Sequence, residues 1–231
     1  MVLSFLTVPA LAQQTSVAES KVENSAVTEE PVAATALQWI ERLSYAMRTL
    51  NFDTSFVVVY NNRAEPYRWI HGISDGQELE LLTLMNGPRK EAIRIDNHVS
   101  YIESENPPYS IISNTITSPI PRALFADVSK LQETYNFIGV GKSRILARPA
   151  QLIRLESKDK QRFGYWLWLD IESGLLLKAA VISREGELLE QIQFTHLIIT
   201  DSFNEQLTQI KTATLPQPMT VNQATANLPW Q

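Results

Sequence analysis

The stretch from Phe163 to Thr200 constrains the fold most, because its pattern predicts three β-strands joined by two tight turns. The turns are Asp170–Gly174 and Ser183–Gly186, and each ends in a glycine, the residue that best tolerates a positive φ. The runs between them are apolar and rich in β-branched and aromatic residues, which is typical of strands. We therefore predict an antiparallel meander.

The two faces of this meander differ from strand to strand. In its last strand, Leu188, Ile192 and Phe194 alternate with mostly polar residues, as in a sheet that is covered on one side. In the first two strands apolar residues fall on both alternations, with Trp166 and Trp168 on one of them. A sheet that is apolar on both faces must be covered twice, or be covered once and face a ligand.

Most of the remaining chain up to residue 157 is also predicted to be strand. Turn signals such as Asp75-Gly76 and Asn86–Pro88 separate short apolar runs. The expected strands cover residues 52–60, 67–73, 78–85, 91–96, 99–103, 135–146 and 151–157.

Two helical elements accompany these strands. Thr35 opens an amphipathic helix, and a second short helical segment is expected within residues 122–133. The first helix should direct at the sheet its apolar residues Trp39, Leu43, Met47 and Leu50. The pattern predicts an α+β fold, mainly antiparallel β, in which one large sheet must curl or be filled by helices.

Composition excludes several classes of protein. With 231 residues, of which 44% are hydrophobic, the chain can bury one substantial core. Its net charge of -5 argues against nucleic-acid binding, which favours a basic surface. Because the chain has no cysteine, a disulfide, a thiolate metal site and a cysteine nucleophile are all excluded.

Both ends of the chain are expected to lie outside the folded domain. Residues 1–12 form a short apolar run that ends in Ala-Leu-Ala, the small-residue pattern of signal cleavage, so we expect export. The usual basic residues before this run are missing, so the natural start is expected further upstream. Residues 13–34 carry too little apolar surface to fold and should form a disordered leader. The domain is assigned to residues 35–201, and residues 202–231 to a linker that a second domain would normally follow.

The spacing of polar residues reveals no catalytic or metal-binding group. Residues 136–143 superficially resemble a phosphate-binding loop, but no helix follows that could bind the phosphate. Acidic pairs fall in hairpin turns, where solvent and turn hydrogen bonds explain them. The histidines are isolated from one another: His71, His98 and His196. We therefore expect no catalytic residues, no metal and no cofactor.

The apolar side chains leave room for a ligand hypothesis beside ordinary core packing, which explains most of them. Two short helices cannot fill a wide twisted sheet, so part of a concave apolar wall should remain. An acyl chain bound there gains ~0.8 kcal/mol for each methylene removed from water. Which face forms the wall is left open, and alternation along the strands selects as ligand-binding residues Phe56, Val58, Tyr60, Trp69, Leu82, Ile93, Tyr101, Phe125, Trp166 and Trp168.

Several segments resemble the RseB/MucB family of periplasmic regulators of the sigma-E envelope stress response, over roughly residues 36–200. The order and spacing of the matching segments carry the resemblance more than any one of them does. They are Arg42–Met47 with Leu50-Asn-Phe52, Met85–Arg89 with Glu91, Tyr135–Ile145, and Trp168–Leu175 with Leu189-Glu-Gln191.

The resemblance implies a half-barrel of antiparallel strands around helices, similar to the LolA/LolB lipoprotein carrier and receptor folds. It also implies a periplasmic protein that binds the periplasmic domain of a membrane anti-sigma factor and shields it from regulatory proteolysis. Acyl chains of lipid or lipopolysaccharide are implied to loosen that grip. The family has no catalytic residues to transfer, and its usual second domain is expected to be missing after residue 231.

Two other functions stay open. A carrier or receptor for lipoprotein acyl chains would use the same half-barrel, and transfer of a diacylated protein between membranes would favour it. A hydrolase acting on envelope polymers would need an acid–base pair facing the cavity, for which Asp170 and His98 are the candidates.

Overall fold

The computed structural model describes residues 34–116, 119–121 and 127–219. Within them the chain forms three helices and eleven strands. In chain order these are α1 (Ala36–Thr49), β1 (Asn51–Tyr60), β2 (Arg63–Ser74), β3 (Gln77–Leu84), β4 (Lys90–Ile95), β5 (His98–Glu103), β6 (Tyr109–Ile112), α2 (Val128–Thr134), β7 (Tyr135–Ile145), β8 (Arg148–Ser157), β9 (Gly164–Asp170), β10 (Leu176–Ile182), β11 (Leu188–Thr200) and α3 (Glu205–Lys211).

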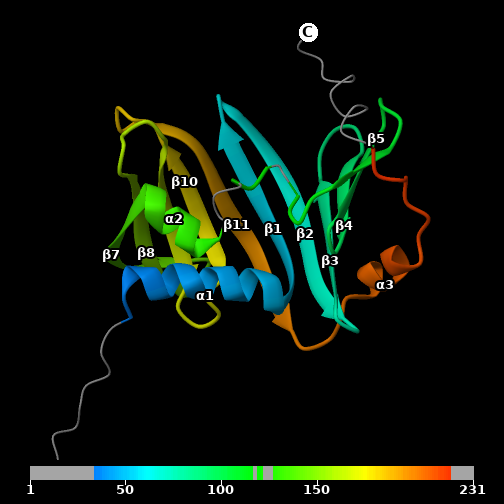
Figure 1. Ribbon diagram of the computed structural model, residues 1–231, viewed down its shortest axis with the longest axis horizontal. Coiled ribbons are helices and arrows are strands. Elements are labelled where there is room, and N and C mark those ends of the chain that lie inside the picture. The colour runs from blue at the N-terminus through cyan, green and yellow to red at the C-terminus, as the bar shows by residue number, and fades with distance from the viewer. Residues whose placement is uncertain (1–33, 117–118, 122–126, 220–231) are drawn as a thin grey trace, which may run out of the picture. The chain divides into compact units, whose positions relative to one another are not determined.

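All eleven strands belong to one open sheet in the order β6-β5-β4-β3-β2-β1-β11-β10-β9-β8-β7. Every neighbouring pair is antiparallel, and only β1 and β11 are joined across a long sequence separation. Figure 1 shows β7 and β5 toward opposite ends of this sheet. The predicted α+β class, mainly antiparallel β with one large sheet, is confirmed.

The meander expected over residues 163–200 corresponds to β9, β10 and β11. Its two turns place Gly174 at φ 83° and Gly186 at φ 90°, the left-handed region in which a glycine is least strained. Gly174 has a second reason to lack a side chain, because a Cβ there would lie 2.7 Å from Cγ of Arg42. The prediction of this segment from turn chemistry and apolar runs is confirmed.

Helix α1 covers one face of the sheet and begins where the sequence predicts. Thr35 caps it, since its Oγ1 accepts a hydrogen bond from the backbone N–H of Gln38 while its own N–H donates to the Gln38 side chain. The buried side of the helix presents Trp39, Leu43 and Met47 to the main core cluster of the sheet. Figure 1 shows α1 crossing in front of the strands, and we call this side the α1 face.

Helix α3 covers the opposite face, beside β2 and β3. Leu207 and Ile210 of this helix join Ile70, Leu79 and Ile93 in a second, separate apolar cluster. Ile70 alternates along β2 with Trp69, which belongs to the main cluster, so the two clusters lie on opposite faces. Residues 205–211, within the segment predicted to be a linker, thus fold onto the sheet.

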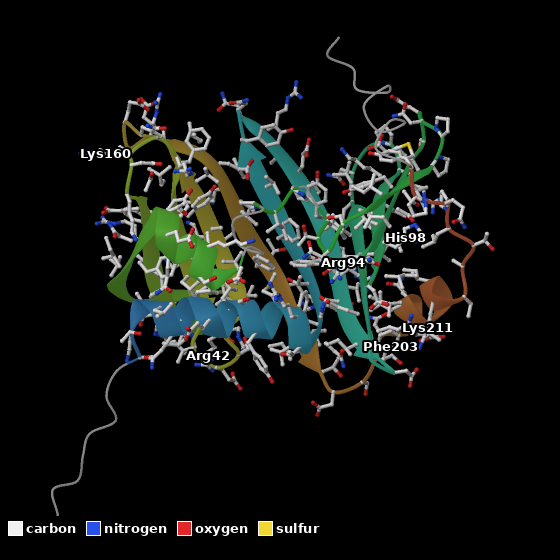
Figure 2. All side chains as sticks on the ribbon, viewed as in Figure 1. Arg42, Arg94, His98, Lys160, Phe203 and Lys211 are labelled. Atoms are coloured by element: carbon white, nitrogen blue, oxygen red, sulfur yellow. The ribbon has the colours of Figure 1, made fainter. Side chains whose placement is uncertain are left out.

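The close approach of α3 depends on a residue with no side chain. A Cβ at Gly72 would lie 2.9 Å from the ring of Phe203 and 3.0 Å from Leu207. Lys211, at the end of the helix, also pairs with Asp75 at 2.7 Å (Figure 2). Helix α3 is therefore held against the sheet by buried apolar side chains and by one exposed ion pair.

Some predictions fall outside the described residues. These are the signal sequence at residues 1–12, nearly all of the leader at 13–34, Phe125, and the first part of the helix expected within 122–133. The described part of that helical segment is α2, capped by Asp127. None of the helices in the described part of the chain is both long and apolar enough to cross a membrane.

Candidate functional site

Among the described residues, native side chains pack between α1 and the middle of the sheet. Ile116, Ile120 and Leu131, from the connection after β6 and from α2, join the main core cluster on this face. A cavity next to Met47 and Trp69 measures about 10 Å³. That volume is at the lower limit for a single water molecule, so the region beside Met47 and Trp69 is packed and this cavity has no room for an acyl chain.

A larger hollow lies over strands β2 to β6 of the sheet. It has a volume of about 240 Å³. We call it the aromatic groove, and it is lined by Tyr67, Leu82, Lys90, Glu91, Ala92, Tyr101, Glu103, Tyr109 and Ile111.

Two stacked rings give the aromatic groove its apolar floor. The centroids of Tyr101 and Tyr109 are 5.1 Å apart with an angle of 23° between the ring planes. They belong to β5 and β6, where the register places them directly opposite each other. Such a cross-strand aromatic pair both stabilises the sheet edge and offers a flat surface to an apolar ligand.

The polar atoms of the groove remain neutral phenols or paired ions. Burial raises the pKa of Tyr67, and the nearby Glu65 carboxylate, which accepts a 2.8 Å hydrogen bond from its hydroxyl, raises it further. Burial likewise raises the pKa of Tyr109. Lys90 and Glu103 pair across the rim at 3.8 Å. The site can therefore hold an apolar group and offer hydrogen bonds at its edge, and it shows no acid–base pair poised for catalysis.

Among the sequence-selected residues, six lie on the α1 face. Phe56, Val58 and Trp69 are buried in the main core, Tyr60 packs against it, and only Leu82 and Tyr101 line the aromatic groove. Tyr67, Tyr109 and Ile111 were not selected. Tyr67 lies on β2, whereas the positions of Tyr109 and Ile111 follow from the pairing of β5 with β6, which no local sequence signal marks.

Three of the selected residues do not lie on the α1 face with these six. Ile93 lies on the opposite face in the α3 cluster, because it alternates with Ala92 of the main core. Trp166 and Trp168 likewise alternate with Leu167 and Leu169 of the main core, so they point away from α1. A single ligand wall on the α1 face therefore cannot include Ile93, Trp166 or Trp168.

On the outer face the two tryptophans make contacts of their own. Their ring centroids are 6.3 Å apart, and the ammonium of Lys178 lies 4.8 Å from the ring centroid of Trp168. Lys178 is the direct cross-strand partner of Trp168. The contact between the Lys178 ammonium and the Trp168 ring explains why both side chains are partly buried, and no ligand is needed to explain it.

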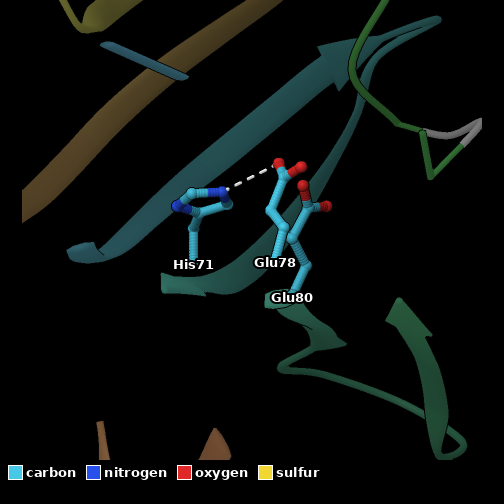
Figure 3. A group of neighbouring side chains, drawn as sticks. All are labelled: His71, Glu78 and Glu80. Carbon is cyan, nitrogen blue, oxygen red and sulfur yellow. Dashed lines mark hydrogen bonds and ion pairs between the residues drawn. The ribbon is translucent and has the colours of Figure 1, made fainter. Parts of the chain in front are cut away.

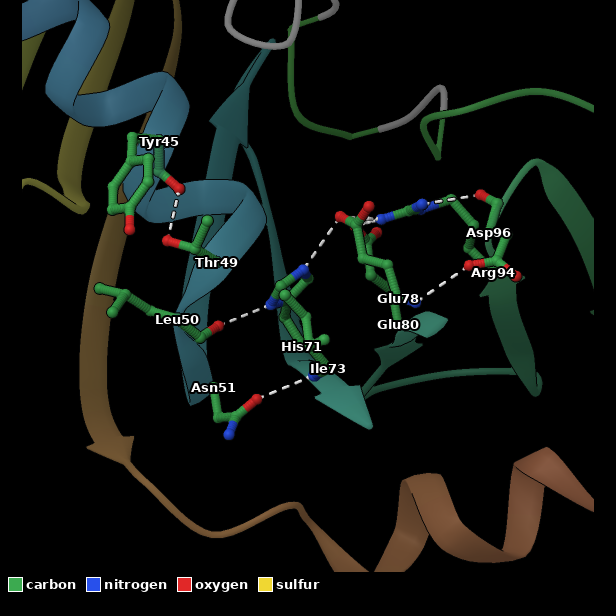
Figure 4. A network of polar contacts seen from close by, with 10 residues as sticks. All are labelled: Tyr45, Thr49, Leu50, Asn51, His71, Ile73, Glu78, Glu80, Arg94 and Asp96. Atoms are coloured by element: carbon green, nitrogen blue, oxygen red, sulfur yellow. Dashed lines mark hydrogen bonds and ion pairs between the residues drawn. The ribbon is translucent and has the colours of Figure 1, made fainter. Parts of the chain in front are cut away.

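A buried polar network joins α1 to strands β2, β3 and β4 (Figure 4). His71 on β2 contacts the backbone oxygen of Leu50 through Nδ1 at 2.7 Å and Glu78 through Nε2 at 3.0 Å. Arg94 on β4 reaches both Glu78 and Glu80, the latter at 2.5 Å, and donates to the backbone oxygen of Asp96 at 2.7 Å. The network connects the end of α1 with three neighbouring strands.

Hydrogen bonds hold the charge on Glu78. Burial works against this charge, but hydrogen bonds from His71 and Arg94 outweigh it and lower the pKa of that carboxyl. The guanidinium of Arg94 thus faces the two carboxylates of Glu78 and Glu80.

The same residues are the candidate metal ligands in the described part of the chain. One ligand atom from each of His71, Glu78 and Glu80 lies within 4.8 Å of the others (Figure 3). The guanidinium of Arg94, which is 3% exposed, already contacts both carboxylates. Because that cation fulfils the role a metal would have, we interpret the group as a structural ion-pair network.

The residues suggested for a hydrolase do not form a site. Asp170 is fully buried and accepts hydrogen bonds from Arg148 and from the backbone and hydroxyl of Ser173. Burial opposes its charge, but these hydrogen bonds lower the pKa of the carboxyl. Nε2 of His98 lies 3.2 Å from the backbone oxygen of Pro216, and six strands separate β5 from β9 in the sheet.

Comparison with known proteins now identifies the family. The model of the MucB/RseB N-terminal domain matches residues 35–219, a range that includes α3. This chain belongs to the MucB/RseB family. The match also extends the family domain beyond residue 201, the boundary expected from the sequence.

Individual relatives agree with this assignment. The sigma-E factor regulatory protein RseB of Escherichia coli K12 is 29% identical over 182 residues, which cover 79% of this chain and 57% of RseB. The sigma factor AlgU regulatory protein MucB of Pseudomonas aeruginosa is 32% identical over 166 residues, covering 71% of this chain and 51% of that protein. This MucB/RseB chain therefore spans little more than half the length of these two relatives.

Solved structures of MucB resemble the fold described above. The complex of Pseudomonas aeruginosa MucA and MucB matches with a TM-score of 0.62 and 30% identity, covering 81% of this chain and 64% of that one. A crystal structure of MucB with the periplasmic part of MucA matches with a TM-score of 0.61. The names of these relatives describe regulators and binding proteins, in keeping with the absence of a catalytic arrangement among the described residues of this family member.

Proposed function

We propose that this chain is a periplasmic negative regulator in a sigma-E type envelope stress response, and that it binds the periplasmic region of a membrane anti-sigma factor. The observation that carries the proposal is the likeness, at 30% identity over 81% of the chain, to MucB solved together with MucA. The proposal assigns binding and no catalysis to this domain.

Binding would protect the anti-sigma factor physically. A protease cleaves a segment that it can hold in an extended, accessible form, and a segment ordered against another protein is withdrawn from it. Shielding the periplasmic region in this way would keep the anti-sigma factor intact and the stress response low. The open sheet, which α1 and α3 cover only in part, offers surface for such an interaction.

We propose that a lipid signal acts through the aromatic groove. The core beside Met47 and Trp69 is packed, whereas the groove holds about 240 Å³ beside Leu82 and Tyr101. An acyl segment in the groove would gain ~0.8 kcal/mol for each methylene removed from water. We propose that lipid or lipopolysaccharide acyl chains enter there and weaken the hold on the anti-sigma factor.

The carrier function has less support. Ligand pockets for drug-sized molecules usually measure about 300–1,000 Å³, and two or three complete acyl chains need more than the groove offers. A carrier must enclose its cargo to carry it through water, whereas a sensor needs to contact only part of it. The volume of the groove therefore favours the regulator.

Calorimetric titration tests the proposal. The periplasmic region of the anti-sigma factor from the same organism is added to the purified chain, and saturable binding is expected. Absence of heat and of co-migration on gel filtration, both for this chain and for a protein of the length of RseB, would reject the proposed function.

A further inference from the structure

The two edges of the sheet differ in what covers them. Along β6, the backbone N–H of Met219 donates to the oxygen of Ser110 at 2.8 Å, and Ser110 forms an isolated parallel bridge with Pro218. The chain thus covers part of this edge with its own residues. At the other end of the sheet, β7 pairs with β8 on one side and with no other strand in the described part of the chain (Figure 1).

An edge strand of this length that no described strand covers is unusual, because its free N–H and C=O groups can pair with an extended chain. Helices α1 and α2 contact β7, but its middle, from Gly139 to Arg144, is exposed to solvent. A Cβ built at Gly139 or Gly141 meets no atom within 4 Å, so the face of the sheet is open there too, and the register shifts between these glycines as at a β-bulge. The exposed residues make the middle of the strand accessible to a second backbone.

The charge of this edge is uniform. β7 contains no acidic residue, and Lys142 and Arg144 are exposed on it, in a chain whose net charge is -5. Neither makes an ion pair with another described residue, whereas the neighbouring Arg148 and Arg154 on β8 are already paired with carboxylates. Two unpaired cations on an open edge attract an acidic segment and repel a basic one.

A pocket continues from the start of the same strand. It has a volume of about 380 Å³ and lies between the first turn of α1, α2 and β7, with Leu37, Tyr135 and Phe137 among its walls. A strand added along β7 would direct every second side chain toward this face of the sheet. One apolar side chain of the added strand could enter the pocket, the arrangement by which strand addition acquires specificity.

We propose that the edge of β7 binds an extended acidic segment of the partner protein by adding it to the sheet as a twelfth strand, with an apolar side chain in the pocket beside Leu37 and Phe137. The inference rests on the proposed function, since the partner is the periplasmic region of the anti-sigma factor. A second copy of this chain fits the edge less well, because pairing β7 with β7 would bring Lys142 and Arg144 of both copies together.

Charge reversal at the edge tests the inference. The double variant K142E/R144E should bind the anti-sigma periplasmic region at least about tenfold more weakly than the natural chain. The matched control is R63E/R184E, which changes the net charge equally at two exposed positions, the first residue of β2 and the turn between β10 and β11, and should change the affinity by less than about threefold. Equal affinities for both double variants would overturn the inference while leaving the proposed function intact.

The pocket is tested by L37E. A glutamate in the first turn of α1 is compatible with the positive end of the helix, so the fold should be retained while the pocket loses its apolar wall. Binding should weaken about tenfold, with an unchanged melting temperature. If L37E binds as the natural chain does, the pocket is not part of the interface.

Hydrogen exchange distinguishes strand addition from other contacts. Backbone amides of β7 should exchange more slowly when the anti-sigma region is bound, with no comparable change in β6. Unchanged exchange in β7 despite saturating binding would overturn the inference. So would protection of β7 that grows with the concentration of the chain alone, since the edge would then pair two copies. If the natural chain binds no anti-sigma region, the proposed function itself fails.

Discussion

At the scale of single residues, the buried charges of Arg94 and its partners determine how β2, β3 and β4 fit together. Arg94 is 3% exposed and lies between Glu78 and Glu80, and His71 contacts Glu78 from the other side at 3.0 Å. Each charge is costly to bury alone and is tolerated only because its counter-charges are in contact. Replacing one of these charged side chains should therefore lower the free energy of unfolding by more than an intact ion pair adds to it.

The variant R94M tests this dependence. It should lower the free energy of unfolding by about 3–5 kcal/mol, because the buried Glu80 and the partly buried Glu78 would lose their shared cation. Urea unfolding measures the change. The exposed R63M serves as control and should stay within about 0.5 kcal/mol of the natural chain. A similarly small effect of R94M would show that the network contributes little.

The pH dependence of stability provides a second test at this scale. The pKa of Asp170 is lowered in the folded protein, so its contribution is present above the unfolded pKa and is lost as the pH falls through the folded pKa. Glu78 acts in the same direction. The difference in unfolding free energy between the natural chain and D170N should therefore shrink as the pH falls from neutral to below 3.8, the ordinary pKa of an aspartate. A gap that stays constant across this range would contradict the assignment.

At the scale of elements, α3 shows how a short segment completes the fold. Its seven residues bury Leu207 and Ile210 against the face opposite α1, and Gly72 provides the space. The variant G72A should lower the free energy of unfolding by about 1–3 kcal/mol, because the new methyl group collides with Phe203 and Leu207. Thermal or urea unfolding measures it, with G139A as control, since no atom lies near the Cβ position there. An unchanged stability of G72A would mean that α3 is loosely attached.

The aromatic groove gives a prediction for the edge elements β5 and β6. Ile111 is partly buried at its border, and I111E would place a charge where an acyl chain should lie. Binding of a fluorescent fatty acid should weaken about tenfold or more, as expected for a charge placed in an apolar site. The exposed V59E, on a strand outside the groove, should bind as the natural chain does. Equal binding by both variants would place any lipid elsewhere.

At the scale of the whole molecule, sequence patterns predicted what is periodic and long. The helix opened by Thr35, the meander over residues 163–200 and the single antiparallel sheet all follow from alternation and turn chemistry. β6 and α3, with four and seven residues, are too short to show a period. Their positions depend on contacts with strands far away in the sequence.

The candidate site was less predictable for a related reason. Alternation separates Leu82 from its neighbours and Ile93 from Ala92, but it does not say which side of the sheet α1 covers. Ile93 is buried by α3, which lies more than a hundred residues further along the chain, so its local pattern does not show that it lies on the face opposite α1. The same limit explains why Trp166 and Trp168 were grouped with residues of the α1 face.

We propose that this MucB/RseB domain shields an anti-sigma factor by binding it. The most direct measurement is the rate at which the regulatory protease cleaves the periplasmic region of that anti-sigma factor as increasing amounts of the chain are added. We expect cleavage to slow in step with saturation of the complex. Cleavage that continues at its original rate in the presence of a saturating amount of the chain would contradict the proposal.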